Sequence, residues 1–363
     1  MQYKFNFRPY RRRFKPPIQT NHGIWDVRDG IIVCLSNQTG VGAGEIAPIS
    51  WFGSETIEQA LDFCRQLPGE ITQETIFSIP NELPACQFGF ESAWEDFVAE
   101  EMGRWGDGEK SPITSLSHPL IPLSSTPVVS SRETQRRHWF PLAPHPSPLT
   151  YSGLLPAGEA ALQRWENLWN QGYRTFKWKI GVYPIALELE VFDLLTRALP
   201  ALALVRLDAN GGLSYDQACL WLDKCDRLRA DDKIPVEIEF IEQPLRVEQF
   251  TSMLELSYCY ATAIALDESV ASIPQIEACY QQSWQGIFVI KPSIAGSPKR
   301  LRQFCQAHNI DTVFSSVFET SIGRQAALKL AVELSHNNRA VGFGVNHWFE
   351  QDEQTWLKQL WNH

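Results

Sequence analysis

The feature that most constrains the fold is a regular alternation of short apolar segments and amphipathic helical segments in the C-terminal half of the chain. The apolar segments cover 176–180, 205–208, 239–241, 263–266, 286–290 and 312–314. The helical segments cover 159–171, 184–199, 214–229, 247–257, 273–282 and 297–308. Such alternation predicts parallel strands joined by helices, in either an open doubly wound sheet or a (β/α) barrel. Because no G-x-G-x-x-G or G-x-x-x-x-G-K-[ST] follows a first strand, the usual nucleotide-binding reason for the open sheet is missing.

The N-terminal third has a different order of elements. A short apolar run at 30–35 meets a turn-rich stretch at 37–40 and resumes at Val41, which predicts two antiparallel strands joined by a hairpin. Helical patterns follow at 56–67 and around 87–102, and strands before helices are typical of an α+β unit. The basic run at 11–13 is expected to form a solvated edge of the first strand.

A segment rich in proline and serine separates the two patterns. Eight prolines and seven serines fall within the 37 residues from Pro112 to Pro148, a density that forbids continuous helix and disfavours a central strand. The segment therefore predicts an extended connection between two units. We expect an α+β capping domain over 1–135, a barrel over 136–345, and a C-terminal segment over 346–363 that returns towards the cap.

Composition narrows the classes of partner. The chain carries 42 acidic and 32 basic side chains and a formal net charge of −10, which argues against non-specific binding to nucleic acid. Its eight cysteines include no Cys-x-x-Cys pair, so neither a zinc knuckle nor a redox motif is indicated, and free thiols in a reducing compartment are expected. No stretch of about 18 apolar residues occurs. We expect a cytoplasmic protein that acts on a small-molecule carboxylate, without nucleic acid, a membrane or an obligate protein partner.

Ionisable residues stand at the ends of five successive predicted strands. In chain order they are Lys177, Lys179, Asp208, Glu242, Asp267 and Lys291. From Lys179 onward the gaps are 29, 34, 25 and 24 residues, each close to one strand–helix unit. In a (β/α) barrel the C-terminal ends of the strands meet at one mouth, where active sites are built. Because side chains two apart in a strand share a face, both lysines of the first pair are expected to point into that mouth.

Three carboxylates on consecutive strands would repel one another unless a cation lay between them. A hard divalent cation with oxygen ligands, most naturally Mg²⁺ with Mn²⁺ as a substitute, is the simplest partner. Such an ion would neutralise the charge that builds on a substrate carboxylate when the adjacent C–H loses its proton. A lysine close to a second cation has a lowered pKa and could be the base, an environment that Lys177 and the ion provide for Lys179. The pattern therefore predicts proton abstraction α to a carboxylate.

Five short motifs follow one another at barrel spacing. They are TFKWKIG at 175–181, RLDAN at 206–210, IEQPL at 241–245, LDES at 266–269 and IKPS at 290–293. Together they resemble the motifs of the enolase superfamily, muconate-lactonising subgroup. Further stretches, KPSIAGS from Lys291 and FSSVFETSIG from Phe314, are most similar to the o-succinylbenzoate synthase family, as are TNHG at 20–23 and GEIAP at 44–48 in the N-terminal part. The resemblance implies a modified (β/α)7β TIM barrel with an N-terminal α+β capping domain whose loops close over the barrel mouth.

The family resemblance also implies a role for each ionisable residue. Lys179 would take the α-proton of 2-succinyl-6-hydroxy-2,4-cyclohexadiene-1-carboxylate and then, as general acid, help hydroxide to leave from the same face. Lys177 would hold a carboxylate oxygen and lower the pKa of Lys179, and Lys291, across the ring, would stabilise the enediolate. Loss of water gives aromatic 2-succinylbenzoate, a step of menaquinone and phylloquinone synthesis. The Mg²⁺ ligands would be Asp208, Glu242 and Asp267.

The remaining expectations concern substrate contacts and competing activities. Five residues are expected to bind the substrate or to support its site: Arg206, Asn210, Ser315, Ser316 and Gly342. Contacts from the cap would lie around 22–25 and 51–53. An N-acylamino acid racemase or a dipeptide epimerase of the same superfamily would use the same ion and lysines, so the catalytic motifs do not separate the three activities. A barrel that only binds a metal or a partner is the alternative of a different class, and three intact lysines argue against it.

Overall fold

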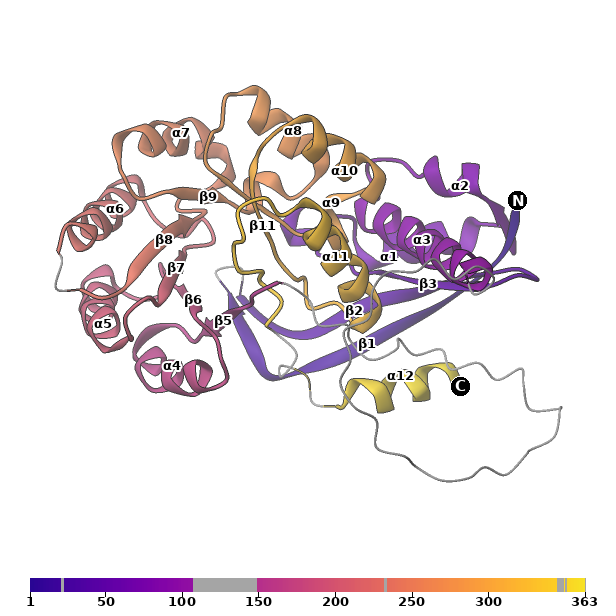
Figure 1. Ribbon diagram of the computed structural model, residues 1–363, viewed down its shortest axis with the longest axis horizontal. Coiled ribbons are helices and arrows are strands. Elements are labelled where there is room, and N and C mark those ends of the chain that lie inside the picture. Colours follow the sequence, from indigo (N-terminus) through magenta and orange to yellow (C-terminus); the bar gives the residue numbers. More distant parts are fainter. Residues whose placement is uncertain (21–22, 107–148, 232–233, 345–348, 350, 363) are drawn as a thin grey trace.

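Two sheets organise the chain (Figure 1). The structure is a computed structural model that describes residues 1–20, 23–106, 149–231, 234–344, 349 and 351–362. A four-stranded sheet in the order β3-β2-β1-β4 belongs to the N-terminal part. A seven-stranded sheet in the order β11-β10-β9-β8-β7-β6-β5 belongs to the rest, and its neighbouring strands are parallel.

The N-terminal sheet is built on a long antiparallel hairpin. β1 (Gln2–Thr20) pairs with β2 (Gly23–Ser36), β3 (Val41–Ile46) extends the sheet beyond β2, and β4 (Glu70–Thr72) pairs with the other edge of β1. The helical elements are η1 (Ser50–Phe52), α1 (Ile57–Gln66), α2 (Gln73–Phe77) and α3 (Pro84–Gly106). The predicted hairpin, which is β2 and β3, and the two predicted helices, which are α1 and α3, are confirmed.

Glycines let β3 lie directly against α3. A Cβ atom on Gly44 would lie 2.0 Å from the carbonyl oxygen of Gly89, and one on Gly42 would lie 2.1 Å from that of Ala93. Because a side chain at either position would collide with the helix backbone, only glycine permits this approach. The close packing fixes β3, and with it the carboxylate of Glu45, against the rest of the cap.

Seven parallel strands form most of the barrel wall. They are β5 (Ser152–Leu155), β6 (Thr175–Lys179), β7 (Leu204–Asp208), β8 (Glu237–Glu242), β9 (Ile264–Leu266), β10 (Ile287–Ile290) and β11 (Asp311–Phe314). Two isolated bridges, Tyr151 to Val341 and Ser315 to Gly342, join the two edges of this sheet. The eighth position of the barrel is therefore taken by residues 341–342, and the predicted (β/α)7β barrel with an N-terminal cap is confirmed.

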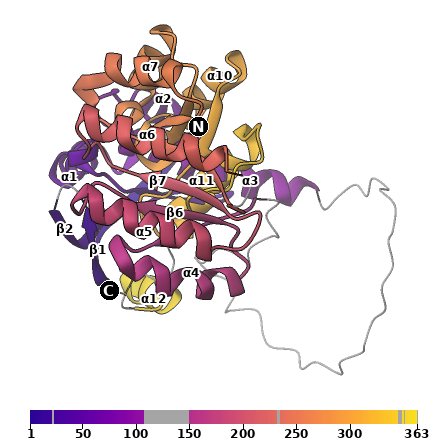
Figure 2. The same ribbon diagram turned by 90° about the vertical axis from the view of Figure 1, so that its left-hand side faces the viewer.

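Helices cover the outside of this barrel. They are α4 (Ala161–Asn170), α5 (Ile185–Ala198), α6 (Tyr215–Arg229), α7 (Phe250–Cys259), α8 (Ile273–Gln281), α9 (Pro292–Ala295), α10 (Pro298–Ala307) and α11 (Ser321–Leu334), with short 3-10 turns η2 (Gly158–Ala160), η3 (Val247–Gln249) and η4 (Glu268–Val270) between them. Figure 2 shows α4, α5 and α6 side by side on one outer face. All six predicted strands and six predicted helices occur, whereas β5, α9, α11 and the bridging residues 341–342 were not predicted.

Successive side chains of β6 point alternately to the surrounding helices and to the inside of the barrel. Phe176 and Trp178 are fully buried on the side that faces the helices, where the Trp178 ring stacks on Phe192 with centroids 6.5 Å apart. Lys177 and Lys179 therefore point to the inside of the barrel. The apolar half of the strand holds the wall in place while the polar half supplies the site.

The C-terminal helix α12 (Glu353–Asn362) packs against β1, beside the cap in Figure 1. The Trp356 ring meets Tyr10 edge-on at 5.2 Å, and the guanidinium of Arg12 lies 3.9 Å from the centre of the Phe349 ring. The expectation of a fully solvated basic edge at 11–13 is wrong for Arg12, which is buried under these aromatic rings. The predicted domain limits at 135/136 and 345/346 lie outside the described residues.

Within the described ranges, no helix combines the length and the hydropathy needed to cross a bilayer.

Candidate active site

Six ionisable side chains gather at the C-terminal ends of the barrel strands. They are Lys177 and Lys179 on β6, Asp208 and Glu242 at the last positions of β7 and β8, and Asp267 and Lys291 directly after β9 and β10. The parallel register sets Lys179 beside Asp208 and Asp208 beside Glu242. The structure thus brings together every residue that the strand-end pattern singled out.

Lys177 lies between two carboxylates. Its Nζ is 2.6 Å from Oε1 of Glu242 and 3.0 Å from Oδ2 of Asp208. The Nζ of Lys179 is 3.5 Å from the same oxygen of Asp208 and also donates to Oδ1 of Asn210. Because Lys177 has two charged partners at short range, it is held more firmly than Lys179.

Burial and neighbouring charges shift the pKa values of the acids in this cluster in different directions. Burial raises the pKa of Glu242 to about 8, opposed by Lys177 and reinforced by Asp208 and Asp267. Burial also raises the pKa of Asp267, whereas the two lysines beside Asp208 outweigh its burial and lower its pKa. Burial would lower the pKa of Lys177, but its three carboxylate neighbours raise it well above its usual value. The cluster has three lysines for three carboxylates, so burial and the nearest charges, not an excess of either sign, set the direction of each shift.

The donor set fits a hard divalent cation, although its oxygens are engaged by lysines. Asp208, Glu242 and Asp267 are all buried and offer carboxylate oxygens, the ligands that Mg²⁺ prefers. The raised pKa values of Glu242 and Asp267 point the same way, because an added positive charge would favour their ionised forms. In the part of the chain that is described, no three His, Cys, Asp or Glu side chains form a preassembled metal group. A cation would therefore take its ligands from ion pairs with lysine.

Asn210 connects Lys179 to a carboxylate that the motif reading did not single out. Its Nδ2 donates to Oε1 of Glu268 at 3.0 Å, and its backbone N–H donates to Oδ1 of Asp208 at 3.2 Å. Asn210 has a φ of 44°, a left-handed backbone that asparagine tolerates better than most residues. Asn210 thus lies at the site. Glu268, which directly follows Asp267 in the LDES motif, also lies there but was not among the expected site residues.

The site opens into a cavity of about 120 Å³ between barrel and cap. The three lysines, Asp208, Asp267 and Asn210 line its floor, and cap residues Ile18, Trp25, Ile49, Trp51 and Phe52 line its roof. From the barrel, Phe318 packs edge-on against Trp25 with ring centroids 5.5 Å apart. This aromatic roof falls in and around the cap stretches expected at 22–25 and 51–53. Phe318 lies within the FSSVFETSIG stretch but was not singled out as a site residue.

Ser315, Ser316 and Gly342 all line this cavity, where substrate contacts are expected. A Cβ atom on Gly342 would lie 2.6 Å from the hydroxyl oxygen of Ser315, so glycine keeps room for that hydroxyl. The Ser316 hydroxyl donates to Oε2 of Glu319 at 2.9 Å. These contacts fix one wall of the cavity.

Two buried side chains of the cap hold the loop that carries this wall. The Glu45 carboxylate accepts from the backbone N–H groups of Thr320 at 2.9 Å and Gly323 at 3.0 Å, at the N-terminus of α11. The Arg28 guanidinium donates to the carbonyl oxygen of Val317 at 2.9 Å. Because both contacts cross from cap to barrel, the position of the cap sets the shape of the site.

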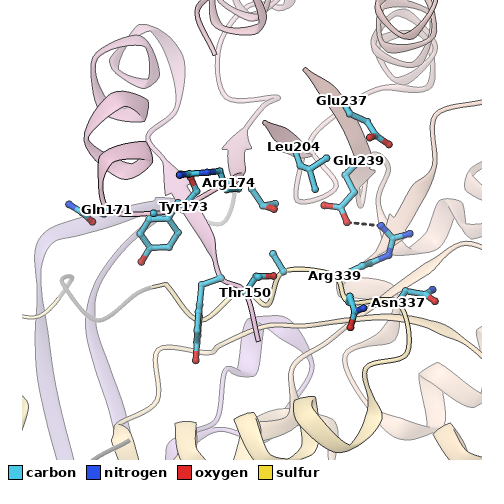
Figure 3. A pocket seen from close by; sticks show the side chains of 14 residues that line it. Thr150, Gln171, Tyr173, Arg174, Leu204, Glu237, Glu239, Asn337 and Arg339 are labelled. Atoms are coloured by element: carbon cyan, nitrogen blue, oxygen red, sulfur yellow. Dashed lines mark hydrogen bonds and ion pairs between the residues drawn. The ribbon is translucent and has the colours of Figure 1, made fainter. Parts of the chain in front are cut away.

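Arg206, which was expected to bind the substrate or to support its site, does not line this cavity. It is 1% exposed, its Nε donates to Oε2 of Glu239 at 2.6 Å, and its Nη1 donates to the carbonyl oxygen of Ala340 at 2.7 Å. A larger cavity, of about 740 Å³, lies at the opposite end of the barrel. Figure 3 shows its lining side chains, with Arg339 pointing to Glu239. Glu239 is paired with both arginines, and Arg339 is also paired with Asp311, so an ion network lines this end of the barrel.

Known proteins resemble the chain over almost its whole length. Residues 160–359 match the family described as Enolase C-terminal domain-like, and residues 14–97 match the N-terminal domain of MenC. The sequence is 35% identical over 350 residues to the o-succinylbenzoate synthase of Thermosynechococcus vestitus, covering 95% of this chain and 93% of that protein.

Solved structures show the same likeness. The o-succinylbenzoate synthase of Thermosynechococcus elongatus BP-1, solved with Mg in its active site, superposes with a TM-score of 0.77 at 33% identity and 99% coverage of both chains. A dipeptide epimerase from Methylococcus capsulatus, solved with Mg and the dipeptide L-Arg-D-Lys, shares the fold with a TM-score of 0.72 at 21% identity, covering 97% of this chain and 93% of that one.

Proposed function

The chain belongs to the o-succinylbenzoate synthase family of the enolase superfamily, and we propose that it is a magnesium-dependent lyase. Its reaction is the removal of water from 2-succinyl-6-hydroxy-2,4-cyclohexadiene-1-carboxylate to give 2-succinylbenzoate, in menaquinone or phylloquinone synthesis. The observation that carries the proposal is the placement of Lys179 and Lys291 on opposite sides of one cavity, next to three buried carboxylates. β6 and β10 are four positions apart in an eight-position barrel, so these lysines face each other.

Asp208, Glu242 and Asp267 would hold the Mg²⁺. The ion would supply positive charge beside the substrate carboxylate while the adjacent carbon loses its proton. Lys177 already lies between Asp208 and Glu242, so it acts as a fixed ammonium donor to a substrate carboxylate oxygen.

Lys179 acts first as the general base and then as the general acid. As the free amine it takes the α-proton, and the electron pair of the broken C–H bond remains on the substrate as an enediolate. It then returns a proton to the leaving hydroxyl, the C–O bond breaks, a ring double bond forms, and water and the aromatic product result. Lys291, on the other side, offsets the negative charge of the enediolate. The aromatic roof excludes water and matches a planar ring.

The test follows ultraviolet absorbance when purified protein, Mg²⁺ and the cyclohexadiene carboxylate are mixed. We expect formation of 2-succinylbenzoate, loss of activity with a chelator and recovery with added Mg²⁺. Lys179→Ala should lower kcat by roughly 10²–10⁴-fold, the usual worth of a general acid–base group. The control, Lys224→Ala, removes a lysine that pairs with Asp193 between the outer helices α5 and α6, and should leave kcat unchanged.

The competing activity is two-base racemisation of an N-acylamino acid or epimerisation of a dipeptide. It is favoured by the same facing lysines, since Lys179 and Lys291 could act on opposite faces of one carbon. Incubation of such substrates in D₂O would show α-deuterium with inverted configuration. That result, together with an absence of 2-succinylbenzoate from the cyclohexadiene, would replace the dehydratase with the racemase.

We also propose that the enzyme works in the cytoplasm without an obligate protein partner. All eight cysteines are free, as a reducing compartment would keep them.

A further inference from the structure

The ammonium group of Lys291 has a partner in the capping domain. Its Nζ lies 4.0 Å from the centre of the Phe52 ring. A cation over the face of an aromatic ring is attracted by the ring quadrupole, and more strongly where water is excluded. Phe52 is 6% exposed, so the contact is largely dry. Lys291 also pairs with the Asp267 carboxylate, a proposed metal ligand, whereas the Phe52 ring is a partner that does not compete for Mg²⁺.

The turn that carries Phe52 is tightly held. In η1 its backbone N–H donates to the carbonyl oxygen of Ile49 at 2.9 Å, and the N–H of Ile49 donates to the hydroxyl oxygen of Ser54 at 2.6 Å. Gly53 follows in a left-handed conformation with φ 113°, and its N–H donates to the carbonyl oxygen of Ser50 at 3.2 Å. A side chain at Gly53 would be strained in that conformation. The ring is therefore presented by a rigid turn.

The Phe52 ring also belongs to the packing between cap and barrel. Its apolar cluster includes Ala271, Ile294 and Val317 from the barrel. Ala271 lies four residues after Asp267, whose Oδ1 pairs with the Nζ of Lys291, and Ile294 lies three residues after Lys291 itself. The ring is thus packed among the same loops that supply this half of the site.

We propose that Phe52 is a positioning residue for Lys291: its ring holds the ammonium group where it faces Lys179 across the cavity. The stabilising lysine is then in place only when the capping domain is docked. The inference rests on the proposed function, because it takes Lys291 as the group that offsets the charge formed on the substrate.

The kinetic test compares Phe52→Leu, which keeps apolar bulk without a ring, with Phe52→Tyr, which keeps the ring. We expect Phe52→Leu to lower kcat by roughly 5- to 30-fold, from the strength of a desolvated cation–π contact, with KM within about twofold. Phe52→Tyr should retain most of kcat. In a Lys291→Met background, Phe52→Leu should add little further loss, because both changes remove one interaction.

A matched control is Phe77→Leu. Phe77 is also a cap residue whose ring lies under a barrel lysine, Lys299, at 5.2 Å, but outside the site. This variant should leave kcat and KM unchanged. It separates loss of the Lys291 contact from a general loosening of the cap.

A second measurement needs neither metal nor substrate. Trinitrobenzenesulfonate modifies exposed amines, and mass spectrometry of peptides gives its rate at each lysine. In metal-free, folded protein we expect Lys291 to react several-fold faster in Phe52→Leu than in wild type, with Lys177 unchanged and with wild-type rates in Phe77→Leu.

Two results would overturn the inference. A rise in KM at unchanged kcat would make Phe52 a substrate contact only, and equal labelling of Lys291 in wild type and Phe52→Leu would show that the ring does not hold the lysine. Absence of 2-succinylbenzoate with wild-type protein would instead refute the proposed function, while the labelling comparison still decides the role of Phe52.

Discussion

Replacing Glu45 by glutamine should destabilise the whole protein by several kcal/mol, although the residue is distant from the chemistry. Its carboxylate is 0% exposed and accepts from the Tyr10 hydroxyl at 2.5 Å, from both the N–H and the hydroxyl of Thr320, and from the N–H of Gly323 at 3.0 Å. A glutamine keeps one acceptor oxygen and turns an NH₂ group towards the remaining donors. About two of the four donors then lose their partner.

The expected size follows from the burial of these donors. A lost hydrogen bond to a buried charged group costs about 1.5–3 kcal/mol, so two of them cost about 4 kcal/mol. That is a large part of the total stability of an ordinary protein, about 5–15 kcal/mol. At an unfolding entropy of about 2.1 cal/mol/K per residue, a chain of this length should lose about 5 °C in Tm.

Thermal unfolding followed by circular dichroism, with a chelator present so that metal binding adds nothing, measures the effect. The control is Glu100→Gln, because Glu100 also accepts from a backbone N–H of β3, that of Val41 at 3.0 Å, but at an exposed position. We expect the control to lower Tm by less than about 1 °C, as most surface changes do. Equal Tm values for Glu45→Gln and Glu100→Gln would refute the reasoning.

Three further outcomes follow from single contacts. Burial and the neighbouring Glu45 raise the pKa of Glu319 to about 7. Its proton is therefore bound more tightly in the folded state, and stability is lost as pH rises from about 4.5 to 7. Glu319→Gln should flatten the dependence of Tm on pH across that range. Arg206→Met should lower Tm by several degrees and leave KM unchanged, because it leaves a buried carboxylate short of a partner far from the cavity. Gly342→Ala should raise KM several-fold by displacing the Ser315 hydroxyl, and added Ser315→Ala should relieve the crowding, as steady-state kinetics and Tm of the three variants would show.

The arrangement of the candidate site residues could be predicted because it follows from the periodicity of strands and helices. Parallel strands end at one side of a sheet, so a charged residue at each strand end meets the others there whatever the loops do. The same rule placed Lys177 and Lys179 on one face of β6, and the structure shows them sharing Asp208. No contact between distant side chains had to be guessed for this part.

The roof of the cavity could not be predicted in this way. Trp25 and Phe318 touch across the domain boundary although nearly 300 residues separate them, and neither stands in a periodic pattern. Phe318 also has a φ of 60°, a left-handed backbone that only its surroundings can enforce. By contrast, α11 could have been predicted from the sequence. Thr320 is a typical N-cap residue, which accepts from the Ile322 N–H, and an alanine- and leucine-rich stretch follows it.

The expectation for Arg206 considered which face of the strand the side chain is on, but not how far along the strand it lies. Its side chain does share the inward face of β7 with Asp208, as a spacing of two requires. Each residue, however, advances about 3.3 Å along a strand, so Arg206 lies about 7 Å deeper in the barrel than the carboxylate. A residue at that depth lies near the N-terminal end of the strands. There it pairs with Glu239, an extra residue that the register shift between β7 and β8 inserts, and Glu239 in turn pairs with Arg339. Position along the strand, and not only the face, decides whether an inward side chain belongs to the chemistry or to the barrel floor.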